Sequence, residues 1–590
     1  MVSGTRHRTT RIHDSITSFG PDTPMNPPTT TAARLILRSL FASAVCLSTL
    51  SAATYYWDTN GATAGLGGSG DWNTSSAHWS TSNTGGVAPF AWNNTTNAAD
   101  LAEFRGVDGG VVTVDAGGIT AASLVTELST TGAYTFQGGP ITLTGTTLLN
   151  GKSGGDITVG TNLIANFATV TADRAFLIQT NQANTVTIDG NITFAASSDA
   201  TGIKTVQLRG THADSVIIFN GTLGGSPGGT ASTRLQVNGS STSKTYINGD
   251  NILSTAGAQV VNGIAYLGHN NALGSGNAQL TNSGTVANGT AAILTNGART
   301  IATNISAGKT GDATTQMIIG GSTAHVSEYS GNISGGNNAS SNLRLSAASG
   351  GRVNFSGTIS GTGGTGLFIK EGAGVVAFTR LAGNTYNRNT EVHAGALILA
   401  NTSGSATGTG NTLTVFNGAT LAGTGISTSA VIANGATSRF SAGDMNQNGV
   451  SSIGTLHLTG GLSASSGATF DFDLNGAQID AINFGTSALT LGGTVTVDFT
   501  SLGTVQTGVA YSLFAGSGTW NSVSATFVIN GPDGYMLDTT YGGGTGYLFN
   551  DATNSFTVQF AAIPEPSTYT LLLGAAGLAL ATARRTRRSL

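Results

Sequence analysis

The chain is poor in cysteine, in charge and in proline. Its 590 residues include one cysteine, Cys46, only 9% charged residues and 10 prolines. A disulfide framework and a thiolate metal centre are therefore excluded beyond the N-terminal region. A hydrophobic content of 39% is too high for a disordered chain, and 87 glycines supply many tight turns. The composition indicates a large folded protein made of many short strands.

The net charge of −4 is unevenly distributed. Arginines concentrate near the two ends, which leaves residues 54–563 with 15 basic and 25 acidic side chains, a net charge of −10. Because an acidic surface repels phosphate backbones, we expect no nucleic-acid partner.

The N-terminal region, residues 1–53, is typical of a secretory leader. Two arginines follow Met25, and an apolar run from Leu40 to Leu50 precedes the small residues Ser51, Ala52 and Ala53. This order of parts indicates a signal peptide that is cleaved after Ala53. We expect translation to start at Met25 and export to use Sec-type machinery. A membrane anchor is the alternative, but the run is short for a bilayer span.

Residues 54–105 are rich in aromatic side chains. They hold four of the five tryptophans: Trp57, Trp72, Trp79 and Trp92. The first coil of a solenoid has an open apolar interior, and large aromatic rings bury the most area per residue. We therefore interpret this region as an N-terminal cap. The alternative is a platform on which a glycan, such as an exopolysaccharide, stacks.

From residue 106 to residue 440 short β-branched segments alternate with glycine, asparagine, aspartate and serine. Val111–Val114 and Thr185–Ile188 are typical, and no helical period persists. Similar segments recur at irregular spacing, as in Val392–Leu399 and Val260–Leu267. Such repeats favour a solenoid over a sandwich. We expect in-register threonine and asparagine side chains to form hydrogen-bond ladders between coils.

Residues 441–562 alternate more strictly and are expected to form the last coils or a small β cap. The pattern predicts Phe470 and Phe472 inward and Asp471 and Asp473 outward. Two carboxylates on one strand could serve as acid and base on a sugar. We favour a solvated outer face, because the sequence places no basic residue nearby and Asp480 and Asp498 are scattered.

Asp444, Asn446 and Asn448 match the first half of a calcium loop. Thr455 occupies the twelfth position, where a bidentate glutamate is expected, so an ordinary turn is favoured. The eight histidines are isolated, and no nucleophile elbow or phosphate loop stands out. We therefore predict no enzymatic activity, no cofactor and no metal.

Residues 563–590 combine three features in a specific order. Pro564, Glu565 and Pro566 precede an apolar run, Tyr569–Ala583, and the run ends at Arg584, Arg585, Arg587 and Arg588. As a helix the run is about 22 Å long, which is marginal for a bilayer core of ~30 Å. The arginines are expected to stay on the cytoplasmic side and stop translocation. A buried C-terminal core helix is the alternative.

This arrangement resembles the PEP-CTERM sorting signal of exported Gram-negative proteins. The resemblance implies that an exosortase-type membrane protease cuts near the motif and releases or transfers the protein. The block Leu367–Leu399 resembles the autotransporter-associated β-strand repeat, which implies right-handed parallel β-helices on exported passengers. No C-terminal stretch is typical of a membrane barrel, so the chain is not expected to secrete itself.

Together these features predict an all-β fold, a right-handed parallel β-helix with an N-terminal aromatic cap and a C-terminal single hydrophobic helix. We expect a non-enzymatic structural or adhesin-like protein of the cell surface or extracellular matrix, held in the inner membrane as an intermediate. The alternatives are a polysaccharide-active lyase or hydrolase on the same scaffold and a carbohydrate-binding protein.

Overall fold

The computed structural model describes residues 52–563 and 578–580, except for residues 108, 129–131, 153, 168–169, 254, 282–288, 309–315, 336–341, 362–365, 410 and 444–451. Within this part the chain is almost entirely β, from β1 (Thr54–Trp57) to β52 (Phe560–Ala562), with one 3-10 turn at Gly542–Gly544. All strand pairings lie between these two strands. The predicted all-β fold is confirmed.

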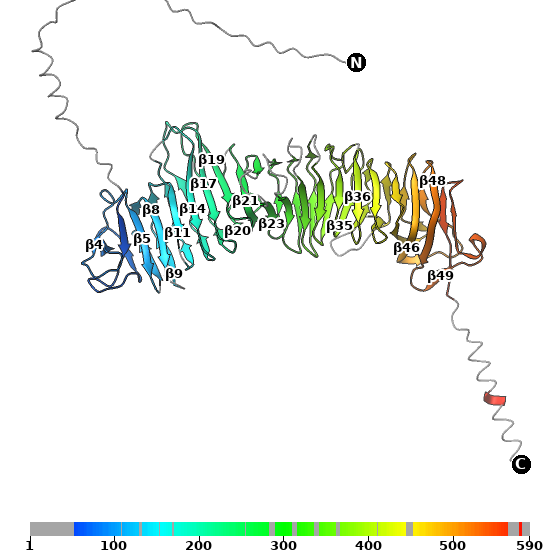
Figure 1. The fold of residues 1–590 in the computed structure, drawn as a ribbon, viewed down its shortest axis with the longest axis horizontal. Helices are drawn as coiled ribbons and strands as arrows, with labels where there is room; N and C mark the ends of the chain where they lie inside the picture. Colours follow the sequence, from blue (N-terminus) through cyan, green and yellow to red (C-terminus); the bar gives the residue numbers. More distant parts are fainter. Residues whose placement is uncertain are drawn as a thin grey trace, which may run out of the picture. The chain divides into compact units, whose positions relative to one another are not determined.

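Most strands belong to coils that stack on one another and pair in parallel with strands about one coil away in sequence (Figure 1). We call the first long row of stacked strands the first sheet. Its members are β1, β5 (Leu101–Gly106), β8 (Ser123–Leu128), β11 (Thr147–Gly151), β14 (Arg174–Thr180), β17 (Ile203–Gly210), β19 (Ser232–Asn238), the first half of β21 (Ala258–Leu267), β22 (Ala278–Leu280), β25 (Ile305–Ala307), β28 (Ile333–Ser334) and β31 (Ile359–Ser360).

A second row runs through nearly all the coils and is called the second sheet. Its members are β2 (Gly70–Trp72), β6 (Gly109–Val114), β9 (Ala133–Gly138), β12 (Ile157–Val159), β15 (Thr185–Ile188), β18 (Val216–Phe219), β20 (Lys244–Ile247), the second half of β21, β23 (Thr290–Thr295), β26 (Gln316–Gly321), β29 (Leu343–Ala347), β32 (Phe368–Glu371), β34 (Thr390–Val392), β36 (Thr412–Phe416), β39 (Ala430–Asn434), β42 (Leu462–Ala464), β46 (Leu489–Val505) and β48 (Trp520–Asn530).

Shorter rows complete the coils. One contains β7 (Ile119–Ala121), β10 (Ile141–Leu143), β13 (Leu163–Ala165) and β16 (Ile192–Phe194). Another contains β24 (Thr300–Ile301), β27 (Val326–Tyr329), β30 (Arg352–Phe355), β33 (Val375–Phe378), β35 (Ala396–Leu399), β37 (Thr420–Gly423), β40 (Arg439–Ala442) and β43 (Gly467–Gly476), which pairs with β46. The last contains β38 (Ile426–Ser427), β41 (Thr455–Leu458), β45 (Ala481–Asn483), β47 (Tyr511–Ala515), β51 (Ser555–Val558) and β50 (Tyr547–Asn550).

The core follows from the period of two along each strand. In β14, β17 and β19, Phe176 pairs with Val206 and Val206 with Leu235, and all three are buried. Fully burying a side chain of this size contributes about 1.5–3 kcal/mol. Because the apolar residues of each coil stack on those of the next, a single coil buries too little to be stable alone.

Coil length is variable. Side chains that meet between adjacent coils are 20 residues apart at Gln259 and Gln279 but 32 apart at Asp498 and Asn530. The difference in coil length lies in the corners between strands, which explains why the sequence repeats are irregular. Gly109 is one such corner, with a φ of +66°. A Cβ there would lie 2.0 Å from the Ala133 carbonyl oxygen, so only glycine fits.

Asparagine ladders join the corners, as the sequence predicts. The Asn248 side-chain amide donates to Asn220, and the Asn220 amide donates to Asp189, each at 2.7 Å. Main-chain amides are held in the same way, since the N–H of Asn191 donates to the Asn162 side chain at 2.9 Å. These bonds satisfy polar groups at turns where no strand partner exists.

Both ends of the stack contain antiparallel strands. At the start, β3 (Ala77–Ser80) pairs antiparallel with β1 and with β4 (Phe90–Ala91). At the finish, β51 pairs antiparallel with β47 and β50, and β49 (Tyr535–Leu537) pairs with β52. Between the two ends, the parallel pairing is not interrupted between residues 440 and 441, where the sequence pattern changes, because β40 pairs in parallel with β43.

Trp79 lies at the centre of the aromatic cluster. Its ring centroid is 4.6 Å from that of Trp92, 5.1 Å from Trp72 and 5.4 Å from Trp57. We predict that Trp79→Ala destabilises the first coils by about 3–5 kcal/mol, because removing this ring leaves a cavity at the centre of the cluster.

Hydrogen exchange followed by mass spectrometry measures this effect coil by coil. Faster exchange confined to the coils near residue 79 is expected, since each coil contacts only its neighbours. Trp520→Ala, a tryptophan at the opposite end, is the matched control and is expected to leave those coils unchanged. Uniform loss of protection along the chain would contradict the nearest-neighbour account.

Candidate functional site

Several predicted sites lie outside the described residues. These are the sorting motif Pro564, Glu565 and Pro566, the arginines Arg584, Arg585, Arg587 and Arg588, and the calcium candidates Asp444, Asn446 and Asn448. Of the C-terminal apolar run only Leu578–Leu580 is described, as helix with exposed side chains. Among the described residues, no helix combines the length and the apolar content that a bilayer span requires.

Ala53, the predicted cleavage residue, is hydrogen-bonded to the first coil through its main chain. Its N–H donates to the Asp100 carboxylate at 2.8 Å, and its carbonyl accepts from the Leu101 N–H at 2.8 Å. Cleavage after Ala53 would remove both bonds. The cleavage position stays a prediction.

The four N-terminal tryptophans are at most 1% exposed. The indole N–H of Trp57 donates to the Gly68 carbonyl and that of Trp92 to the Thr120 carbonyl. A sugar stacks on an accessible ring face, and these faces are enclosed by protein. Their burial supports the role of a cap and argues against a glycan platform at Trp57, Trp72, Trp79 and Trp92.

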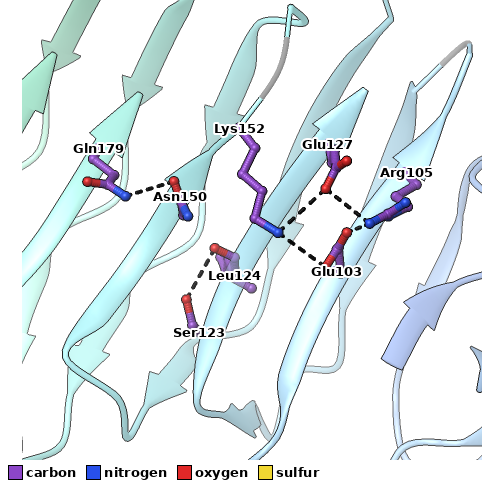
Figure 2. A network of polar contacts seen from close by, with 8 residues as sticks. All are labelled: Glu103, Arg105, Ser123, Leu124, Glu127, Asn150, Lys152 and Gln179. Carbon is purple, nitrogen blue, oxygen red and sulfur yellow. Dashed lines mark hydrogen bonds and ion pairs between the residues drawn. The ribbon is translucent and has the colours of Figure 1, made fainter. Parts of the chain in front are cut away.

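The first sheet carries a charged cluster on three adjacent strands (Figure 2). Arg105 contacts Glu103 on its own strand and Glu127 at 3.0 Å on the next strand. Lys152 lies 3.6 Å from Glu103 and 3.5 Å from Glu127. Two acidic and two basic groups neutralise one another, so the cluster joins three coils without leaving an unbalanced charge. Sequence reasoning missed it because Glu127 and Lys152 lie one and two coils after Glu103 and Arg105.

An amide ladder continues along the same sheet. The Gln179 amide donates to Asn150 at 2.9 Å, as Figure 2 shows. Further along, Gln207 donates to Gln236, Gln236 to Gln259 at 2.6 Å, and Gln259 to Gln279 at 3.2 Å. All four glutamines are half-buried.

The ladder leaves hydrogen-bonding capacity toward solvent. A primary amide has two N–H donors and two acceptor positions, and each ladder bond uses one donor and one acceptor. The sheet repeats this arrangement about every 4.8 Å. A groove of about 390 Å³ beside it is lined by Ser232, Arg234, Asn277 and Gln279, among others. This surface can bind a polymer rich in hydroxyl groups.

The sequence does contain a signal for this ladder. Each glutamine stands between two apolar residues of a strand, as in Val206-Gln207-Leu208 and Leu235-Gln236-Val237. The same pattern recurs at Gln259 and Gln279. Because it repeats at unequal intervals, a search for a fixed period does not detect it.

Asp471 is not a solvated, unpaired carboxylate. Arg439, on the preceding coil, donates to it through Nε at 3.0 Å and through Nη2. The same guanidinium lies 3.4 Å from Asp498, which also accepts from Asn530 at 2.7 Å. The expectations that no basic residue lies nearby and that Asp498 is isolated were therefore wrong. These residues are remote in sequence but meet on successive coils, where Asp471 lies opposite Asp498 and Arg439 lies opposite Thr469, two residues from Asp471 on the same face of the sheet.

Asp473 was predicted to face outward but is only 8% exposed. The chain turns back after it, so that β43 pairs antiparallel with β44 (Gln478–Ile479) and covers this position. Asp480, fully buried, accepts from the Asp473 N–H at 3.0 Å and from the Gly454 N–H at 2.6 Å. Burial raises the pKa of Asp480 to about 7 despite these two bonds. The Asp480 carboxyl thus ties the turn after β43 to residue 454.

Two lysines are buried at the corners. The Lys370 ammonium donates to the carbonyl oxygens of Glu371 at 3.0 Å, Gly372 at 2.7 Å and Ala394 at 2.7 Å. Lys204 donates to three carbonyls in the same way, those of Val170, Ala172 and Thr201. Burial lowers the pKa of Lys370 to about 7. Both lysines bind groups of main-chain carbonyl oxygens, which is a structural role.

With this geometry established, two comparisons bear on function. Residues 562–588 match the family described as the PEP-CTERM protein-sorting motif. Over 152 residues the chain is 37% identical to the adhesin BmaC autotransporter of Brucella suis biovar 1 (strain 1330). That match covers 26% of this chain and 4% of the adhesin.

The chain therefore carries a PEP-CTERM sorting motif at its C-terminus and repeats similar to part of an autotransporter adhesin. Both resemblances inferred from the sequence are confirmed. In the part of the chain that the structure describes, no group of three or more histidine, cysteine, aspartate or glutamate side chains could hold a metal ion.

Asp480 gives the turn a specific pH dependence. Its pKa is higher in the folded protein than the usual value near 3.9, so its contribution to stability is present below about pH 4 and is lost as the pH rises through about 7. We predict that local stability of β43–β45 falls between about pH 4 and pH 7. Asp480→Asn should remove that slope.

Hydrogen exchange of residues 467–483, corrected for intrinsic rates, measures this slope. Asp533→Asn, at an exposed aspartate, is the control and should keep it. An unchanged slope in Asp480→Asn would show that another group titrates.

A substitution at Lys370 tests whether the buried lysine stabilises the corner by binding its carbonyl oxygens. Lys370→Met keeps the length of the side chain but removes the donor from three carbonyls, so we predict a local loss of about 1–3 kcal/mol. Hydrogen exchange of residues 366–399 should accelerate accordingly. Lys244→Met, at an exposed lysine, should have no effect. Equal effects of the two substitutions would contradict the assignment.

Proposed function

We propose that the chain is an exported, non-enzymatic, adhesin-like or structural protein of the cell surface or extracellular matrix. The observation that carries this proposal is the sorting motif at residues 562–588, directly after a stack of coils that ends at β52. The identity to part of an autotransporter adhesin supports the same function. A solenoid suits this role, because its stacked repeats present an extended regular surface.

The proposed route follows the order of the chain. Sec-type machinery exports it, and the signal peptide is removed after Ala53. The run Tyr569–Ala583 then holds an inner-membrane intermediate, with Arg584–Arg588 on the cytoplasmic side. An exosortase-type protease acts near Pro564–Pro566 and passes the coils to the surface or matrix. In this proposal the coils are right-handed, as parallel crossover connections nearly always are.

The proposal that the protein is not an enzyme rests on the side-chain carboxylates of Asp471 and Asp473. Asp471 is held by Arg439, and Asp473 is covered by a turn. Neither is placed as a glycosidase acid or base, which must flank an accessible bond. This supports a structural or adhesive role over a lyase or hydrolase role for that pair.

Carbohydrate binding is the second candidate function. Two features favour carbohydrate binding: the adjoining groove and the amide ladder formed by Gln207, Gln236, Gln259 and Gln279. Both suit a sugar, because sugar hydroxyls donate and accept hydrogen bonds. Here the ligand is an exopolysaccharide that runs along the first sheet rather than one that stacks on tryptophan.

The sorting proposal predicts the termini of the mature protein. Mass spectrometry of protein from the producing cells should show a chain that begins at Thr54 and ends near Pro564–Pro566. Alanine at Pro564, Glu565 and Pro566 together should retain the intact tail in the membrane fraction. Ser567→Ala is the control, because it changes the adjacent residue and keeps the motif. An intact tail on surface-located wild-type protein would contradict the proposal.

The carbohydrate proposal predicts binding of soluble polysaccharide that depends on the ladder. The double substitution Gln236→Ala and Gln259→Ala should lower affinity at least about tenfold, since it removes up to three hydrogen bonds to hydroxyls: two at Gln236 and one at Gln259, whose amide also donates to Thr281. Gln316→Ala, at an exposed glutamine outside the ladder, should bind normally. A glycan array probed with the wild type, the double variant and Gln316→Ala measures this difference. Equal binding by all three would place the glycan elsewhere.

A further inference from the structure

The last strand of the second sheet has a partner on one side only. β48 has 11 residues and pairs in parallel with β46. Among the described residues no second strand pairs with it. In Figure 1 it lies at the orange end of the stacked coils. Along Ser524–Asn530, the outer side of such an edge strand presents main-chain N–H and C=O groups that no further strand takes up.

Apart from one bulge near its start and partial cover by the C-terminal hairpin, β48 carries no device that protects an edge. After a bulge near Ser522, the seven residues Ser524–Asn530 stay in unbroken register with β46. The whole strand, Trp520–Asn530, contains no charged residue and no proline. Edge strands of soluble proteins commonly carry lysine, proline or an inward charge that blocks pairing with another chain. This edge is open to such pairing.

The apolar interior also continues to this edge. Phe527 pairs with Val495 and Ile529 with Val497, and both valines are fully buried. Phe527 and Ile529 themselves are only half-buried, although Phe527 contacts Phe556 with ring centroids 5.1 Å apart. The C-terminal hairpin therefore covers this row in part. On the outer face Val528 is 42% exposed.

The opposite end of the stack offers no matching edge. β2, the first strand of the second sheet, has three residues and ends at the buried Trp72. A head-to-tail joint between two long strands is therefore unavailable. A second β48 does match, because a strand without charge brings no like charges together when it pairs with itself.

We propose that two copies of this chain associate through antiparallel pairing of their β48 strands, tail to tail about a two-fold axis. Each edge then satisfies the main-chain groups of the other, and the two rows containing Phe527 and Ile529 become continuous. The arrangement is isologous, so it closes at two copies and gives no filament. It goes beyond the proposed function and does not depend on it.

Single cysteines test the pairing directly, because Cys46 in the predicted leader is the chain's only cysteine. Ser524→Cys, Thr526→Cys and Val528→Cys are made separately in the chain from Ala52 to Ile563, which contains all the described strand pairings. Opposed residues of antiparallel strands lie about 4.5–5.5 Å apart at Cα, within the range of a disulfide. The cysteine nearest the axis should form a covalent dimer on mild oxidation.

Thr494→Cys is the matched control, because Thr494 is the exposed partner of Thr526 one strand further in. It should remain monomeric on a denaturing gel. The proposal would be overturned if Thr494→Cys cross-linked as efficiently as the β48 cysteines. It would also be overturned if none of the three β48 cysteines formed a covalent dimer.

Sedimentation velocity gives an independent test. The wild-type chain should sediment as a dimer in the micromolar range, whereas Thr526→Lys and Val528→Lys should be monomers with unchanged circular dichroism. Thr494→Lys should stay dimeric. A monomeric wild type, a dimer that persists in both β48 lysine variants, or larger open-ended assemblies would each contradict tail-to-tail pairing.

Discussion

Main-chain hydrogen bonding between successive coils is the constraint on which this structure depends. A coil of 20 to 32 residues has no sheet of its own and cannot bury an apolar face alone. It becomes stable when its strands pair in parallel with those above and below and when stacked residues such as Phe176, Val206 and Leu235 align. Inward positions therefore favour apolar side chains, corners favour glycine or asparagine, and a buried charge needs hydrogen-bonding partners around it.

The same constraint explains the polar features of the described coils. Arg105 lies between Glu103 and Glu127, Arg439 reaches Asp471 on the next coil, and glutamines bond to glutamines. Apart from Arg105–Glu103, which lies within one strand, these contacts join residues about one coil apart and therefore hold neighbouring coils together. The ends are the places where stacking must stop. Buried tryptophans close one end, and a hairpin covers the other in part.

Much of the fold could be predicted from the sequence, because a period of two and frequent glycine are local signals. Thr185–Ile188 was expected as a strand, and the structure has a strand with those bounds. Asp473 was misplaced because a turn at residues 475–478, which the alternation does not reveal, covers it. The Arg439–Asp471–Asp498 contact and the amide ladder were missed for a different reason. Their members meet only through coil register, and that register depends on corner lengths that no fixed period encodes.

Deleting one whole coil tests the central claim most directly. Asn220 and Asn248 occupy equivalent corners 28 residues apart, so removing residues 220–247 joins Phe219 to Asn248 in the same register. If stacking of neighbouring coils determines the fold, this deletion keeps the β circular dichroism and a cooperative thermal transition, whereas deletion of half that length abolishes them. Equal tolerance of both deletions, or equal collapse, would contradict the account.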